Sequence, residues 1–161
     1  MKKVYIETSI ISYLTARQSR DIVGSAHQQI TIDWWEQRRK SFDLYVSSIV
    51  EDEAAKGNLD AAARRLAVIR EIPRLSVLKE ANIFAKTLIK QRALPENAID
   101  DALHIAIASV HGMDYLLTWN CRHIDNAQTK PLMRHLCIEA GLPFPEICTP
   151  EELMEDIYNA G

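Results

Sequence analysis

The chain opens with the stretch Val4-Tyr5-Ile6-Glu7-Thr8-Ser9. Its first three residues form a short apolar run typical of a strand, and the acid and hydroxyl residues after it are typical of the start of a helix. Similar apolar runs followed by polar residues occur at 44–48 and 115–120. Strands that are each followed by a helix indicate βαβ units and therefore a parallel sheet.

Helical segments are expected between these strands. We predict them at residues 10–14, 21–40, 51–56, 60–70, 80–92, 97–111 and 129–140. Two more short strands are expected at residues 75–78 and around Ile147, and a last helix is expected to start at Pro150. The sequence therefore predicts an α/β fold with a central parallel sheet of about four or five strands flanked by helices. Because no change in composition marks a boundary, residues 1–161 are expected to form one domain.

Length and charge restrict the class of protein. The chain has 161 residues, of which 47% are hydrophobic and 25% charged, as in an ordinary soluble domain. It carries 19 Lys and Arg against 22 Asp and Glu, a net charge of −3. A protein that coats nucleic acid by general electrostatics normally has a basic excess. This chain has none, although a metal-dependent site that acts on a single phosphodiester bond is still allowed.

The cysteines and the hydrophobic runs indicate a cytoplasmic protein. Cys121, Cys137 and Cys148 are an odd number without CxxC spacing, so we expect reduced thiols and neither a disulfide framework nor a zinc site. No signal-peptide core follows the first residues. No apolar run approaches the ~18 residues of a membrane span, so no membrane association is expected.

Polar side chains gather where the predicted strands end. Glu7 follows the first strand, Glu53 lies on the helix after the second, Asp101 lies near the start of the 97–111 helix, and Asn120 ends another strand. In open parallel sheets the functional crevice lies beyond these carboxyl ends. Carboxylates that share a crevice repel each other unless a cation neutralises them, and oxygen ligands favour Mg²⁺ or Mn²⁺. The pattern indicates metal-assisted phosphodiester hydrolysis.

The same acids have a simpler interpretation. Acids in the first turn of a helix are stabilised by the helix dipole, which applies to Glu51, Asp52 and Glu53 and to Asp100 and Asp101. Glu51 is also an alternative to Glu53 as the site residue. From spacing alone, both interpretations stay open.

Four segments in order resemble the PIN-domain nucleases, in particular the VapC-type toxins of bacterial toxin–antitoxin pairs. Residues 4–9 are similar to the family's opening strand, acid and Thr/Ser, and residues 46–53 place Glu53 at the family's next acid. Residues 101–108 are similar to its Asp-Ala-Leu-Ile-Ala segment, and residues 116–120 stand where the family usually has Thr-x-Asp.

This resemblance implies a PIN-like three-layer sandwich and Mg²⁺- or Mn²⁺-dependent endoribonuclease activity on RNA. It implies that Glu7, Glu53, Asp101 and Asn120 bind the metal and are the catalytic residues. It also implies a homodimer and a small antitoxin protein as partner.

Two positions depart from the family pattern. Glu7 stands where Asp is usual, and Asn120 stands where a fourth Asp is common. These departures motivate a second hypothesis, a catalytically weakened PIN-fold module that binds RNA or a partner protein. A third is an unrelated α/β domain that handles a small molecule, although the absence of GxGxxG and Walker A segments argues against a nucleotide cofactor.

Several other residues have both a functional and a structural interpretation. We favour helix capping for Thr8 and Ser9, and a packed, hydrogen-bonded side chain for His104, which has apolar neighbours. Trp34 and Trp35 are favoured as core or interface residues over base-stacking ones. The best candidates for RNA backbone contacts are basic residues, namely Arg17, Arg20 and the cluster Arg38-Arg39-Lys40, for which a solvated helix face is favoured.

Overall fold

A parallel sheet of five strands forms the centre of the protein in a computed structural model, which describes residues 1–156. The strand order is β3-β2-β1-β4-β5, and every neighbouring pair is parallel. The strands are β1 (Lys2–Ile6), β2 (Phe42–Ser47), β3 (Arg74–Leu75), β4 (Tyr115–Leu117) and β5 (Glu146–Cys148).

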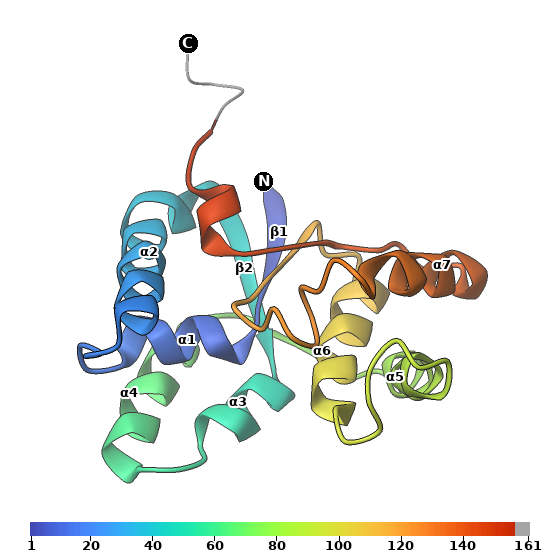
Figure 1. The fold of residues 1–161 in the computed structure, drawn as a ribbon, viewed down its shortest axis with the longest axis horizontal. Helices are drawn as coiled ribbons and strands as arrows, with labels where there is room; N and C mark the ends of the chain where they lie inside the picture. Colours follow the sequence, from blue (N-terminus) through green and yellow to red (C-terminus); the bar gives the residue numbers. More distant parts are fainter. Residues whose placement is uncertain (157–161) are drawn as a thin grey trace.

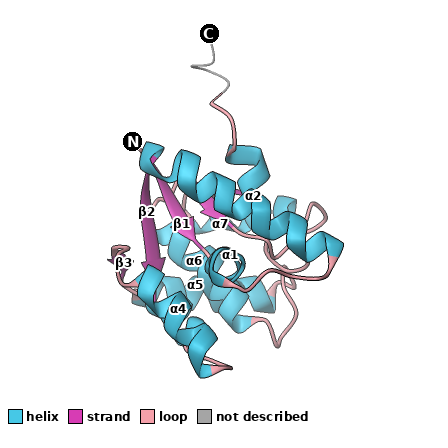
Figure 2. Ribbon diagram, turned by 90° about the vertical axis from the view of Figure 1, so that its left-hand side faces the viewer, coloured by secondary structure: helices cyan, strands magenta, loops and turns pink. Residues whose placement is uncertain are grey.

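Helices cover both faces of this sheet (Figures 1 and 2). One side carries α1 (Thr8–Thr15), α2 (Ile22–Arg38) and α4 (Leu59–Ile69), and α3 (Ser48–Ala54) continues directly from the end of β2. The other side carries α5 (Lys79–Lys90), α6 (Ile99–Val110) and α7 (Lys130–Ala140). The predicted α/β fold with a parallel sheet between helical layers is confirmed.

The core is continuous across the sheet. Val4, Tyr5 and Ile6 are completely buried, because β1 is the central strand and has helices over both faces. Helix α6 is buried from Ala102 to Ser109, which explains why its sequence is apolar on nearly every side. Trp34 is also completely buried, as predicted for a core residue.

Some element boundaries differ from the prediction. The strand expected at 75–78 ends at Leu75, because Leu75 pairs with Ser47, the last residue of β2, and residues 76–78 have no strand beside them. The helix expected at 51–56 begins at Ser48, directly after β2.

Two segments predicted as α-helix, the basic end of the 21–40 helix and the last helix, have another conformation in the structure. Helix α2 ends at Arg38 and is followed by a tighter 3₁₀ turn, η1 (Arg39–Ser41). The segment after Pro150 is likewise a 3₁₀ turn, η2 (Pro150–Leu153). No helix among the described residues has the length and apolar character needed to cross a membrane.

The strand order reverses between β1 and β4, and open parallel sheets have their functional crevice beyond the strand ends at such a point. From β1 the chain moves outward through β2 to β3, and then returns across the sheet to β4 on the other side of β1. Loops diverge in opposite directions at such a reversal, which opens the usual ligand-binding position of an open α/β sheet. Glu7 follows β1 at this point, and residues 118–120 follow β4.

Candidate functional site

Glu7 lies at the reversal point and begins helix α1. Its backbone has an extended conformation, with φ −80° and ψ 156°, and its carboxylate accepts the backbone N–H of Ser9 at 3.1 Å. Glu7 is therefore the N-cap residue, and the prediction that Thr8 or Ser9 caps this helix is wrong. Because the cap requires the residue just before the first helical turn, the acid that ends β1 takes this role.

Two hydroxyl groups hold the Glu7 carboxylate across the crevice. Ser9 Oγ and Thr118 Oγ1 each donate to Glu7 Oε1 at 2.5 Å. Ser9 Oγ also accepts the backbone N–H of Trp119 at 2.8 Å. These contacts connect the ends of β1 and β4 and leave Glu7 only 5% exposed. Sequence reasoning did not assign Thr118 to the site, although its place after a buried strand was the available signal.

Glu53 reaches the same crevice from α3. Its Oε1 accepts hydrogen bonds from Thr8 Oγ1 at 2.6 Å and from His104 Nε2 at 2.5 Å. Glu51 lies on another side of this helix, where it pairs with Arg74. Residues two positions apart on a helix, such as Glu51 and Glu53, point about 200° away from each other, so only one of the two acids can face the crevice. The structure places Glu53 there, as the sequence predicted.

His104 is completely buried and links Glu53 to the sheet. Its Nδ1 lies 2.7 Å from the Tyr5 hydroxyl, which lies 2.8 Å from Ser47 Oγ. The prediction of a packed, hydrogen-bonded histidine is confirmed. Ser47 precedes α3 but makes no capping bond, because its hydroxyl is used by Tyr5.

The protonation states follow from these contacts. Burial alone would raise the pKa of Glu53, but hydrogen bonds from His104 and Thr8 outweigh it and hold that pKa below its ordinary value. Burial alone would lower the pKa of His104, but the hydrogen bond to Glu53 and the charges of Glu7, Glu53 and Asp101 raise it. Burial also raises the pKa of the Tyr5 hydroxyl, which therefore stays neutral. The site favours a glutamate anion beside a histidine cation.

These side chains can hold a metal ion. One ligand atom from each of Glu7, Glu53 and His104 lies within 4.8 Å of the other two. The two carboxylates are hard oxygen ligands, which suit Mg²⁺ or Mn²⁺. His104 fits the role of a direct ligand less well, because both of its ring nitrogens already have partners and its pKa is raised. We therefore assign His104 to positioning Glu53.

Asp101 and Asn120 meet at a different histidine. His123 Nδ1 lies 2.9 Å from Asp101 Oδ2, and the backbone N–H of His123 donates to Asn120 Oδ1 at 2.9 Å. Neither residue belongs to the Glu7–Glu53–His104 group, so their metal-binding role stays a prediction. Sequence reasoning did not identify this contact. The signal was the Asn120-x-x-His123 spacing, which is typical of a side chain that caps a short turn.

The fold and the site together define a class, the α/β domains with a parallel sheet and acids at its carboxyl end. Among solved structures, the VapC20 toxin of Mycobacterium tuberculosis, which cleaves the sarcin-ricin loop, superposes with a TM-score of 0.59 at 15% identity over 74% of this chain and 92% of that one. VapBC2 from Rickettsia felis, solved with a DNA fragment from their promoter, superposes with a TM-score of 0.57. That match has 13% identity and covers 91% of this chain and 98% of the other.

At these identities the likeness establishes the fold. The predicted resemblance to VapC-type PIN domains is therefore confirmed at the level of three-dimensional structure. Comparisons with protein-family models and with curated proteins find no match for the sequence. The likeness is thus carried by the arrangement of strands and helices.

Proposed function

We propose that this protein is a metal-dependent endoribonuclease that hydrolyses RNA phosphodiester bonds, and that it is the toxin of a toxin–antitoxin pair. The observation that carries the proposal is the convergence of Glu7 and Glu53 at the carboxyl end of the sheet. Their ligand atoms lie within 4.8 Å of each other, although the two glutamates lie far apart in the sequence. The likeness to VapC folds supports the same function.

Glu7 and Glu53 would hold Mg²⁺ or Mn²⁺, and Asp101 and Asn120 would complete the site. When bound, such an ion polarises a phosphoryl oxygen and lowers the pKa of a water molecule. The chain's own residues orient the ligands, since Ser9 and Thr118 fix one carboxylate of the pair and Thr8 and His104 fix the other. Hydrogen bonds of this kind raise metal affinity because they remove rotational freedom before binding.

His123 would position the remaining two ligands. It contacts Asp101 through Oδ2, so we assign the other oxygen, Oδ1, to the metal. Asn120 Oδ1 accepts one hydrogen bond from His123, and a carbonyl oxygen has a second lone pair for an ion or a water molecule. Asn120 carries no charge, so the proposed site would offer an ion three carboxylates, those of Glu7, Glu53 and Asp101.

A recess with three arginines, at the end of α1 opposite Glu7, supports RNA as the substrate. It has a volume of about 470 Å³, lies between the end of α1 and the start of α4, and is lined by Arg17, Arg64 and Arg65 and by one acid, Asp60. Arg64 Nε donates to the Thr15 carbonyl and Arg65 Nε to that of Ala54, the residue after Glu53. We assign this recess to a phosphate of the RNA backbone away from the scissile bond, since Arg guanidinium groups bind phosphates strongly.

Cleavage of a single-stranded RNA and of a stem-loop RNA tests the proposal. The purified chain should cut RNA with Mn²⁺ or Mg²⁺, and EDTA or the substitution Asp101→Asn should abolish the cut. Asp100→Asn is the matched control, because it removes the neighbouring carboxylate in the same helical turn. Cleavage that persists in Asp101→Asn at the wild-type rate would contradict the assignment.

The cellular context is also a proposal. We expect a cytoplasmic homodimer that a small antitoxin protein neutralises, by analogy with the VapBC2 assembly whose toxin shares this fold. Expression of the chain alone should arrest bacterial growth, and coexpression of the protein from the adjacent gene should restore it. Growth arrest by an Asp101→Asn variant would show that toxicity does not require cleavage.

One observation favours the alternative, a weakened PIN-fold module that binds RNA or a partner protein. Asp101 and Asn120 are both engaged by His123, which leaves only two acids in the central cluster. Calorimetric titration with Mn²⁺ separates the two functions. Absence of binding at millimolar Mn²⁺ together with retained RNA binding would favour the alternative.

A further inference from the structure

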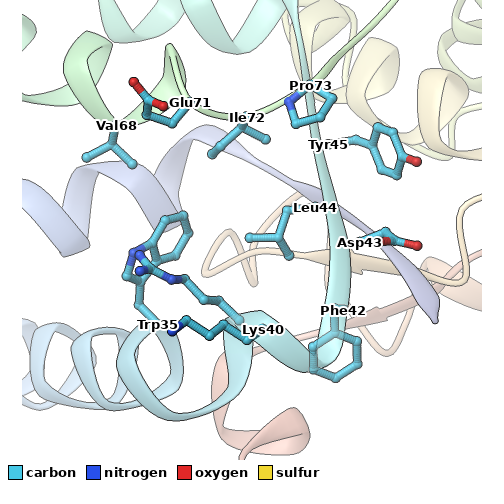
Figure 3. Close-up of a pocket in the computed structure, with 11 residues that line it drawn as sticks. Trp35, Lys40, Phe42, Asp43, Leu44, Tyr45, Val68, Glu71, Ile72 and Pro73 are labelled. Atoms are coloured by element: carbon cyan, nitrogen blue, oxygen red, sulfur yellow. The ribbon is translucent and has the colours of Figure 1, made fainter.

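A second recess lies at the opposite end of β2, away from the acids (Figure 3). Its volume is about 590 Å³. Its apolar lining consists of side chains that are only partly buried, namely Trp35, Phe42, Leu44, Val68 and Ile72. Apolar side chains that line a concave surface and stay accessible indicate a binding surface.

The outer edge of β2, on the side away from β1, has no neighbouring strand along this recess among the described residues. Strand β3 pairs only with Val46 and Ser47, so it leaves the edge from Phe42 to Tyr45 uncovered. Val46 N–H donates to the Pro73 carbonyl at 3.0 Å, on the β3 side. Successive residues of a strand direct their backbone N–H and C=O groups to alternate sides. Leu44 is two residues before Val46, so its N–H and C=O point to the same side as those of Val46, where no strand lies beside Leu44 among the described residues.

These Leu44 groups have no partner among the described residues. The Phe42 N–H, in contrast, already donates to the Arg39 carbonyl. The open edge therefore offers one N–H, from Leu44, and two carbonyl groups, from Leu44 and Phe42. A row of unpaired backbone groups on an edge strand is a template for another extended segment.

We propose that this recess binds an extended segment of another protein, which adds to the sheet beside Leu44 as a short strand. The side chains of such a segment alternate between the two faces of the sheet. Figure 3 shows Leu44 directed into the recess and Asp43 and Tyr45 directed to the other side of β2. The bound segment therefore places one apolar side chain against Leu44, Val68 and Ile72. The residues before and after it in the segment direct their side chains to the opposite face of the sheet.

Charges at the two ends of the recess define the partner further. Arg39 and Lys40 lie at the start of β2, where the Arg39 guanidinium stacks on Trp35 at 5.3 Å. Glu71 lies at the other end of the recess, near Val68. The segment that fits has an acidic residue opposite Arg39 and Lys40, a central apolar residue, and a basic residue near Glu71. This is charge complementarity along a few residues of extended chain.

A second copy of this chain does not fit the open edge. If two β2 strands paired antiparallel around Leu44, the β3 of each copy would occupy the position of Phe42 in the other, because β3 lies on the same edge at Val46. Only a segment that is free of its own neighbouring strand can reach Leu44. An extended or unfolded segment of a partner meets this condition.

Selection of peptides on the full chain tests the proposal. A displayed library of about eight random residues is selected on the immobilised protein, and enriched peptides are synthesised. We expect alternating apolar residues with an acid at one end. In the complex, hydrogen exchange of the Leu44 amide should slow by about tenfold or more, as for an amide that joins a strand ladder.

Two controls separate strand addition from other binding. Ile72→Lys should weaken the enriched peptide by about tenfold or more, whereas Ile83→Lys, at an apolar residue 56% exposed on α5, should leave its affinity unchanged. N-methylation of the peptide amide that faces Leu44 should also abolish binding. RNA cleavage should stay unchanged in both variants, because neither residue lies near the acids.

Three results would overturn the proposal. They are a selection that enriches no peptide, a peptide that binds without slowing Leu44 exchange, and an N-methylated peptide that binds equally well. Protection of the Leu44 amide that rises with protein concentration in the absence of peptide would instead assign the edge to self-association.

Discussion

The two ends of β2 differ in how their polar groups are satisfied. At the carboxyl end, Ser47, Tyr5, His104 and Glu53 form a continuous hydrogen-bonded chain, and the central members are completely buried. Toward the amino end, Leu44 has backbone groups without a partner among residues 1–156 and a partly exposed side chain. The first arrangement fixes carboxylates in advance of binding, and the second stays unsatisfied until another chain supplies the partner.

The difference has a physical reason. A charged group in a buried site is stable only if hydrogen bonds hold it, so the acids at the carboxyl end need partners within the chain itself. Backbone groups at an exposed edge are hydrated and do not require such partners. The two ends of one strand therefore suit different tasks, fixed chemistry at one and recognition of a flexible segment at the other.

We expect the largest effect from the substitution Glu53→Gln, on the rate of RNA cleavage. This substitution keeps the size of the side chain but removes its charge, and we expect the rate of RNA cleavage to fall by about a hundredfold or more. Glu51→Gln is the matched control, since Glu51 faces Arg74 on the same helix and should leave the rate unchanged. Equal rates in the two variants would show that α3 does not contribute to the site.

A smaller loss is expected for His104→Gln. The histidine positions Glu53 without binding the metal in our assignment, so we expect Mn²⁺ affinity to fall by about 10- to 100-fold. Calorimetry gives the affinity, and the rate at saturating Mn²⁺ should recover most of its value. Tyr5→Phe removes only the hydroxyl behind His104 and should have a weaker effect. Complete loss of activity at saturating Mn²⁺ would make His104 a direct ligand.

Truncations at the two ends of β2 should differ in stability. Val46→Ala removes two methyl groups from a completely buried position, and we expect the free energy of unfolding to fall by about 2 kcal/mol. Leu44→Ala acts in the partly exposed recess and should cost about 1 kcal/mol or less, despite removing more atoms. Urea denaturation measures both. A larger loss for Leu44→Ala would mean that the recess is filled in solution.

The pH dependence of stability should show the smallest effect. The pKa of His104 is raised from 6.5, so its contribution is complete below pH 6.5 and decreases as the pH rises through its folded-state pKa. The pKa of Glu53 is lowered from 4.5, so its contribution is complete above pH 4.5 and is lost as the pH falls through its folded-state pKa.

Without metal, this pair is therefore expected to stabilise the fold most between these two values. Above pH 6.5 the decrease is at most about 1.4 kcal/mol per pH unit, because one proton is involved. Urea denaturation in EDTA between about pH 5.5 and about pH 8.5 measures it. The His104→Gln variant should lack this decrease, and an unchanged slope in that variant would assign it to other groups.

Much of the fold was predictable because its signals are local. Short apolar runs followed by capping residues identified the alternation of strands and helices, and the rule that parallel strands end at one edge brought Glu7 and Glu53 to the same place. The exact length of β3 was not predictable, since it depends on where β2 ends. The capping role of Glu7 was missed for a related reason, because Ser9 and Thr8 have other partners in the folded chain.

The sequence by itself determined the fold class and the positions of the acids along the chain, because hydrophobic period and capping act over a few residues. Only the tertiary structure decided which acid of α3 faces the crevice, that His104 holds Glu53, and that His123 engages Asp101 and Asn120. The contact between His104 and Glu53 joins residues 51 apart, and that between Tyr5 and His104 joins residues 99 apart. Such pairs form only when the sheet has brought distant segments together, so no local pattern encodes them.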